Sequence, residues 1–83
     1  MVDNMFIIEA PLTGTFYRRP SPDDLPFVEE GQQVKEGDVT CIVESMKVFT
    51  EVRTERGGIV RRILVEDEDA VQIHQALIEI EAI

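Results

Sequence analysis

An internal repeat limits the folds open to this sequence more than any other feature. Residues 28–44, VEEGQQVKEGDVTCIVE, align without a gap to residues 65–81, VEDEDAVQIHQALIEIE, at an offset of 37. Both segments begin with Val-Glu, end with glutamate and carry a valine at the seventh position. Two copies of one short unit indicate a structure with approximate twofold symmetry.

The apolar segments of the chain are short, alternate with polar residues and are rich in Val, Ile, Thr and Phe. They are MFIIEA, VTCIVES, VFTEVRT, GIVRRILVED and ALIEIEA. Turn-forming residues such as Gly31 and Gly57-Gly58 separate them. This pattern is typical of an all-β sandwich or barrel, and we expect about seven or eight strands and essentially no helix.

The period-2 alternation predicts which side chains of the repeat face the core. Because side chains of a strand point alternately to its two faces, aligned positions of the two copies should be buried together. The predicted core positions are Val39, Cys41, Val43, Ala76, Ile78 and Ile80. Glu79 and Glu81 are expected to face water.

The first copy of the repeat contains an insertion. GTF at 14–16 aligns with GIV at 58–60 at an offset of 44, whereas the segments downstream align at an offset of 37. The first copy is therefore about seven residues longer than the second. The insertion falls within residues 18–27, RRPSPDDLPF, which contain three prolines. Proline cannot donate to a central ladder, so these residues predict a protruding loop. Composition alone leaves open whether the loop is functional or incidental.

Length and charge exclude several classes of function. The 83 residues predict a single domain, residues 1–83. A net charge of −9, from 17 acidic and 8 basic residues, argues against nucleic acid and anionic membrane surfaces as partners. No apolar run is long enough to span a membrane, and MVDNMF does not resemble a secretory signal, so we expect a cytoplasmic protein. Cys41, the only cysteine, is expected to be a small buried hydrophobic residue.

The segment CIVESMKVFTEV, residues 41–52, predicts a tight hairpin with Met46 and Lys47 as its two turn residues. The register that follows pairs Ser45 with Val48, Val43 with Thr50, and Cys41 with Val52. Ile42 and Phe49 then fall on the outward face. Two-residue hairpin turns require positive φ and favour Asn-Gly or Asp-Gly, so Met-Lys is a poor choice for folding.

A sequence that breaks a local rule without a structural gain often marks a functional site. The chain has only two lysines, and Lys35 lies in the polar KEGD segment, whereas Lys47 lies at the predicted hairpin apex. An ordinary solvated lysine is the alternative interpretation. An exposed lysine has a pKa near 10.4, so an enzyme would have to activate it for acylation.

IVESMK, together with GTFYRRPSPDDLPFVEEGQQVKEGDVTCIVE, resembles the biotinyl domains of the biotin carboxyl carrier family. The resemblance extends from about Ile7 to Ile80 and implies a flattened barrel or sandwich of two four-stranded antiparallel sheets with quasi-twofold symmetry. It also implies biotin in amide linkage to Lys47, added by a biotin protein ligase that uses ATP.

The residues around Lys47 match the attachment motif of that family with some departures. The resemblance implies that Glu44, Ser45, Met46 and Val48 are recognised together with the lysine. Ser45 stands where alanine is commoner in the family, Val48 where methionine or leucine is commoner, and Thr50 where asparagine is frequent. Residues 18–27 correspond to the "thumb" that members from acetyl-CoA carboxylase carry.

The resemblance implies a carrier without catalysis of its own. Biotin on Lys47 would shuttle a carboxyl group between the biotin carboxylase and the carboxyltransferase of acetyl-CoA carboxylase, which forms malonyl-CoA for fatty acid synthesis. The domain is expected to be a monomer in the cytoplasm, or in the plastid stroma if the source is a plant.

Three alternatives remain open at the level of sequence. A lipoyl-type carrier domain of a 2-oxo acid dehydrogenase has a similar fold, but usually carries Asp-Lys-Ala, whereas Met46 precedes Lys47 here. The chain could also be the biotinyl domain of another acyl-CoA or pyruvate carboxylase, or a small β interaction module without a cofactor.

No catalytic or metal site is predicted elsewhere. His74 aligns with Gly37 in an outward turn and has no nearby cysteine to share a metal. The acidic residues 66–69, EDED, lack the spacing and the glycine of a calcium loop and are expected to form a solvated turn.

Overall fold

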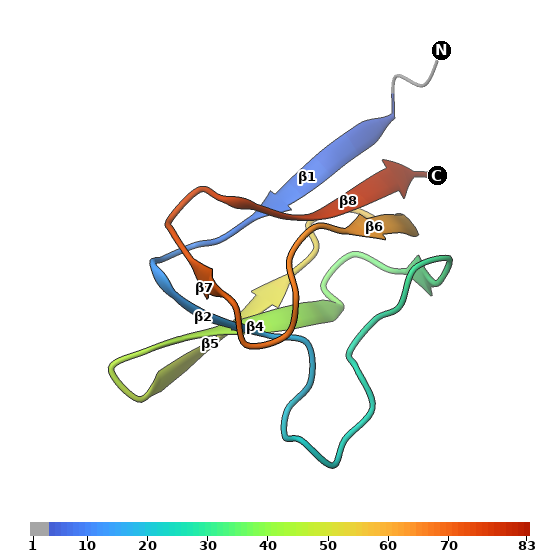
Figure 1. The fold of residues 1–83 in the computed structure, drawn as a ribbon. Coiled ribbons are helices and arrows are strands. Elements are labelled where there is room, and N and C mark those ends of the chain that lie inside the picture. The colour runs from blue at the N-terminus through green and yellow to red at the C-terminus, as the bar shows by residue number, and fades with distance from the viewer. Residues whose placement is uncertain (1–3) are drawn as a thin grey trace.

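The computed structural model describes residues 4–83 and contains eight β-strands and no helix within that range (Figure 1). The strands are β1 (Met5–Glu9), β2 (Gly14–Tyr17), β3 (Gln33–Val34), β4 (Val39–Ser45), β5 (Val48–Arg53), β6 (Gly58–Ile63), β7 (Ala70–Val71) and β8 (Ala76–Ala82). Within the described residues there is no helix long and apolar enough to cross a membrane.

The strands form two four-stranded sheets that face each other. Their orders are β1-β8-β6-β3 and β5-β4-β2-β7, and every pairing is antiparallel. The molecule measures 40 × 26 × 20 Å, so the sandwich is flattened. The predicted all-β architecture is confirmed.

One apolar core lies between the sheets and joins the two copies of the repeat. Its buried members are Ile8, Ala10, Phe16, Val28, Val34, Cys41, Val43, Val52, Val60, Val71, Leu77, Ile78 and Ile80. Of the predicted core residues, Cys41, Val43, Ile78 and Ile80 are buried as expected.

The prediction for Ala76 is wrong, because this residue is exposed, and Val39 is only partly buried. A β-bulge explains both differences. Leu77 is skipped in the pairing of β8 with β1, and Thr40 is skipped in the pairing of β4 with β5. Each skipped residue turns inward and is buried, which ends the alternation one residue early. The two bulges occupy aligned positions of the repeat.

The turns repeat as well, at the level of single residues. Gly31 and Gly37 have positive φ, and so do Glu68 and His74, the residues aligned with them at an offset of 37. The backbone N–H of Gly31 donates to the carbonyl of Val60, and that of Glu68 donates to the equivalent carbonyl in β2. The second copy therefore keeps a left-handed backbone without the glycines that favour it. The predicted quasi-twofold symmetry is present in the backbone.

This symmetry gives the β4–β5 hairpin a counterpart. β8 and β1 pair as β4 and β5 do, with Glu81 opposite Met5 where Glu44 is opposite Phe49. The hairpin turn thus corresponds to the place where β8 ends and β1 begins. Figure 1 shows the turn at one end of the sandwich and these strand ends at the other.

The burial of Cys41 generates a first prediction. Its side chain is fully buried, and burial raises the pKa of the thiol to about 12, although a contact from Thr40 lowers it slightly. At pH 8 the thiolate fraction of the folded protein should be about one in ten thousand. Iodoacetamide should therefore leave Cys41 unlabelled in the folded protein and label it once urea unfolds the chain, as intact mass would show. Rapid labelling of the folded protein would contradict this burial.

Candidate functional site

The β4–β5 hairpin has the predicted register. Ser45 pairs with Val48, and the ladder continues through five further pairs to Val39 opposite Arg53. Met46 and Lys47 are the two turn residues, with φ of 53° and 66°. Positive φ at both positions is the feature that distinguishes type I′ hairpin turns.

The turn is strained at both residues because neither is glycine or asparagine. A left-handed backbone costs an ordinary L-residue about 1–2 kcal/mol. One hydrogen bond offsets part of this cost: the backbone N–H of Lys47 donates to Oε2 of Glu44 at 2.8 Å. Glu44 therefore holds the turn from the preceding strand.

The side chains at the tip point into solvent. Lys47 is exposed, and it takes part in none of the ion pairs found within residues 4–83. The apolar side chains of Met46, Val48 and Phe49 are 91%, 64% and 63% exposed. Apolar residues gathered on one exposed tip are typical of a surface that another molecule covers.

A groove lies beside the hairpin, on the outer face of its sheet. The side chains of Tyr17, Ile42 and Phe49 line one part of it, with the rings of Tyr17 and Phe49 6.4 Å apart. Residues 19–22 also line it, and the groove has a volume of about 380 Å³. The predicted outward direction of both Phe49 and Ile42 is confirmed, and Ile42 is partly buried because it lies in the groove.

Sequence reasoning missed this groove and the residues that complete it. Tyr17, Arg19 and Asp67 line it together, although Asp67 comes from the turn before β7. No local pattern joins Arg19 to Asp67, because the two residues are brought together only by the folded repeat.

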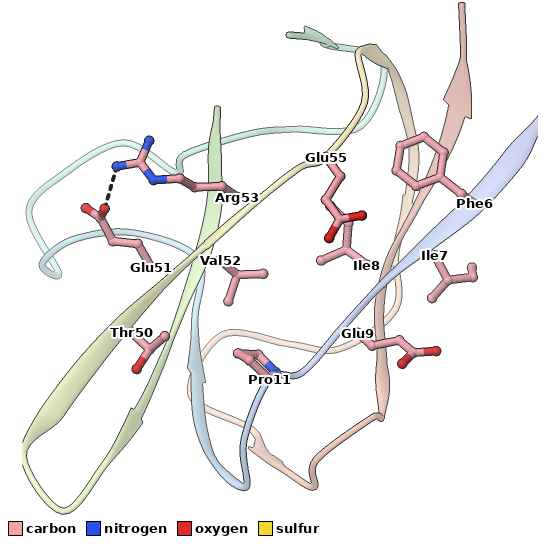
Figure 2. A pocket seen from close by; sticks show the side chains of 10 residues that line it. All are labelled: Phe6, Ile7, Ile8, Glu9, Pro11, Thr50, Glu51, Val52, Arg53 and Glu55. Carbon is pink, nitrogen blue, oxygen red and sulfur yellow. Dashed lines mark hydrogen bonds and ion pairs between the residues drawn. The ribbon is translucent and has the colours of Figure 1, made fainter. Parts of the chain in front are cut away.

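A second pocket, of about 390 Å³, lies between β1 and β5, the edge strands of the two sheets (Figure 2). Ile8, Pro11 and Val52 contribute apolar atoms, and Glu51 forms an ion pair with Arg53 at 2.7 Å beside them. The turn residues of the hairpin do not line this pocket.

The other residues that the sequence singled out, His74 and residues 66–69, lie in turns outside the β4–β5 hairpin. His74 is an exposed turn residue, 3.7 Å from a carboxylate oxygen of Glu9. Residues 66–69 form the expected turn, in which the backbone N–H of Glu66 donates to the side chain of Asp69. Among residues 4–83, no three His, Cys, Asp or Glu side chains are placed to hold a metal ion.

The hydrogen bond from Lys47 to Glu44 generates a second prediction. Glu44→Ala removes the acceptor and should lower the free energy of unfolding by about 1 kcal/mol, while Glu44→Gln keeps an acceptor oxygen and should lower it less. Urea unfolding measures both effects, and amide exchange at Lys47 reports the bond itself. Glu55→Ala, at an exposed glutamate beyond the end of β5, is the matched control. Equal stability of Glu44→Ala and the control would show that this bond does not support the turn.

Comparison with known proteins connects this site to a family. A family model described as "Biotin-requiring enzyme" (Biotin_lipoyl) matches residues 7–80. The chain is 47% identical over 75 residues to the biotin carboxyl carrier protein of acetyl-CoA carboxylase from Haemophilus influenzae. The aligned residues make up 90% of this chain and 48% of that relative. It is 45% identical over 74 residues to the protein of that name from Pseudomonas aeruginosa, covering 89% of this chain and 47% of the relative.

A chloroplast relative extends the comparison to plants. The biotin carboxyl carrier protein of acetyl-CoA carboxylase 2 from Arabidopsis thaliana is 39% identical over 70 residues, which is 84% of this chain and 28% of that protein. The chain thus spans about half the length of the two bacterial relatives, and less of the plant protein. With a family match over nearly all of its length, the chain belongs to the biotin-requiring enzyme family, as the resemblance of its hairpin motif and of residues 14–44 predicted.

Proposed function

We propose that this chain is a biotin carrier domain in which Lys47 holds biotin through an amide bond to Nζ. The observation that carries the proposal is the position of Lys47 at the apex of a type I′ turn that it fits poorly. The site fits such a group, because the amine is exposed and takes part in none of the ion pairs within residues 4–83. A modifying enzyme can therefore reach the amine from several directions.

The residues beside Lys47 have separate roles in this proposal. Glu44 holds the turn, and Ser45 and Val48 close it as the last pair of the ladder. Met46 presents an exposed apolar side chain to the enzyme that modifies the lysine. Recognition of the site then depends on the shape of the folded tip as well as on its sequence.

Biotin supplies a ureido nitrogen that accepts and releases a carboxyl group. The chain itself supplies a lysine side chain of four methylene groups at the turn that closes the β4–β5 ladder, at one end of the sandwich (Figure 1). We therefore propose a carrier without catalysis of its own. Delivery from a tethered tip is effectively intramolecular, which raises the local concentration of the carried group.

The names of the relatives support acetyl-CoA carboxylase as the complex that this carrier serves. Its partners would then be a biotin protein ligase, which loads Lys47, and the biotin carboxylase and carboxyltransferase, which the loaded domain visits in turn. The product of that complex is malonyl-CoA for fatty acid synthesis. We place the protein in the cytoplasm, or in the plastid stroma if its source is a plant, as the chloroplast relative supports.

We also propose that residues 1–83 form one biotinyl domain and that residues 18–27 are its thumb. The core shared by both sheets supports the first part. The second part is supported by the position of this loop, which forms one wall of the groove beside the hairpin.

Loading of Lys47 tests the proposal directly. After co-expression with a biotin protein ligase and free biotin, intact mass should show one biotinyl increment, and peptide mapping should place it on Lys47. Lys47→Arg should abolish the increment. Lys35→Arg, at the other exposed lysine, is the matched control and should load normally.

Two outcomes would overturn the proposal. A wild-type chain that stays unmodified while a known acceptor is loaded in the same cells would contradict biotin attachment. A lipoyl increment on Lys47, added by a lipoyl ligase in place of biotin, would assign the chain to the carriers of 2-oxo acid dehydrogenases.

A further inference from the structure

The thumb, residues 18–27, is a closed and internally bonded loop. At its base the backbone N–H of Phe27 donates to the carbonyl of Arg18 at 2.8 Å. Within it, the hydroxyl of Ser21 donates to Oδ2 of Asp24 at 2.8 Å, and the backbone N–H of Asp24 donates back to the carbonyl of Ser21. These bonds fix the shape of the loop but not its direction relative to the sheets.

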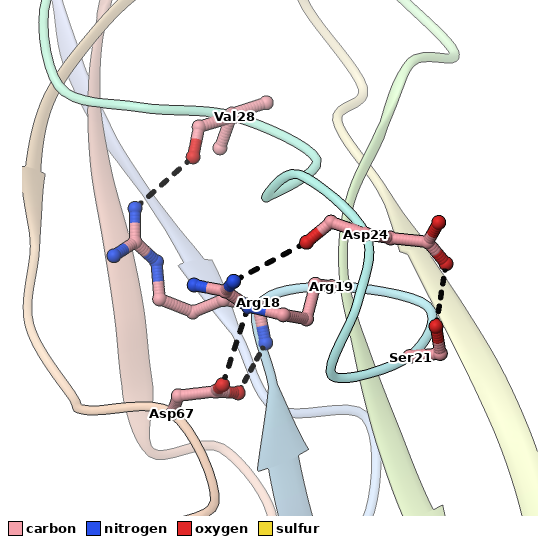
Figure 3. A network of polar contacts seen from close by, with 6 residues as sticks. All are labelled: Arg18, Arg19, Ser21, Asp24, Val28 and Asp67. Atoms are coloured by element: carbon pink, nitrogen blue, oxygen red, sulfur yellow. Dashed lines mark hydrogen bonds and ion pairs between the residues drawn. The ribbon is translucent and has the colours of Figure 1, made fainter.

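Asp67, from the second copy of the repeat, contacts the thumb at two successive residues (Figure 3). Its Oδ1 accepts the backbone N–H of Arg18 at 2.8 Å, and its Oδ2 lies 3.5 Å from Nε of Arg19. Arg19 continues the connection, because its Nη1 donates to the carbonyl of Asp24 at 3.2 Å. One carboxylate is therefore linked to the base of the thumb directly and to its far part through Arg19.

The two contacts of Asp67 are partly sheltered from water. The side chains of Arg19 and Asp67 are 31% and 30% exposed, and Nε of Arg19 is buried without a hydrogen-bond partner among the described residues. Ion pairs that are partly removed from water are screened less than pairs on an open surface. Asp67 is thus the nearest compensating charge for Arg19.

The turn that carries Asp67 is itself fixed to the sheet. The backbone N–H of Phe16, in β2, donates to the carbonyl of Asp69 at 2.8 Å, and the N–H of Glu68 donates to the carbonyl of Phe16 at 2.7 Å. Phe16 is fully buried in the core. Asp67 therefore holds the thumb from a rigid support, whereas residues 18–27 contain no strand of their own.

We propose that Asp67 is a positioning residue that holds the thumb in place and so keeps the groove beside the carrier hairpin formed. Thumb residues line the groove together with Tyr17, Ile42 and Phe49, and Asp67 lines it as well. Loss of Asp67 should release the thumb and open the groove. The inference concerns the shape of the groove. It rests on the proposed function only in treating the β4–β5 hairpin as the carrier hairpin.

The chain offers a natural reporter for this groove. Tyr17 is its only tyrosine, and the chain has no tryptophan, so tyrosine fluorescence reports the groove alone. Quenching by acrylamide, a neutral molecule, should increase in Asp67→Ala. The Phe27 amide, whose own acceptor is untouched by the substitution, should exchange about tenfold faster, which corresponds to about 1.4 kcal/mol.

Two further variants separate the contacts. Asp67→Asn keeps an oxygen acceptor for the N–H of Arg18 but loses the ion pair, so its effects should be intermediate. Arg19→Gln removes the same ion pair from the other side. The double variant Asp67→Asn with Arg19→Gln should be disturbed less than the sum of the two single variants, because the ion pair that the two residues share is lost only once.

Glu68→Gln is the matched control. It removes one negative charge from the same turn and the same groove, and it should change neither quenching nor exchange at Phe27. Unchanged quenching and exchange in both Asp67→Ala and Asp67→Asn would overturn the proposal. So would equal effects in Glu68→Gln, because they would assign the change to charge alone.

Loading by a biotin protein ligase separates this inference from the proposed function. Asp67→Asn should load at the wild-type rate, because the bond from Lys47 to Glu44 does not involve Asp67. A failure to load the wild-type chain would contradict the proposed function and leave the quenching result valid. Normal loading with unchanged quenching in every variant would contradict only the role of Asp67.

Discussion

The left-handed backbone at Met46 and Lys47 is the constraint that the rest of the molecule has to satisfy. Neither residue favours that conformation, so the flanking strands must hold it. They do so through an uninterrupted ladder at the tip and through Val43, whose side chain is fully buried between the sheets. Glu44 adds a hydrogen bond at the turn itself. The sandwich is in this sense a rigid support for one lysine.

The twofold repeat explains how so short a chain forms such a support. Bulges, turns and core positions recur at an offset of 37, so each half buries its apolar face against the other. The two copies then differ in function at two places. The hairpin turn corresponds to the ends of β1 and β8, and the thumb has no counterpart in the second half. The first difference carries the proposed attachment lysine, and the second lines the groove beside the hairpin.

Much of this architecture could be predicted from the sequence because its signals are local. The alternation of CIVESMKVFTEV gave the hairpin register, and the gapless repeat gave the symmetry. Ala76 was misplaced because a bulge leaves no mark in the hydrophobic pattern, and Leu77 takes the inward position instead. The contact of Asp67 with Arg19 could not be predicted, because it joins residues from different halves of the chain and depends on the direction of the thumb.

The most direct test of this account is the stability of a chain whose turn is replaced by the residues that a type I′ turn favours. Met46→Asn combined with Lys47→Gly should raise the free energy of unfolding by about 1–2 kcal/mol, because the strain relieved at both positions is partly offset by the greater conformational entropy that glycine loses on folding. The same variant should accept no biotin. Urea unfolding of this variant beside the wild-type chain measures the difference. A variant no more stable than wild type would contradict the claim that the hairpin keeps a strained turn in order to present its lysine.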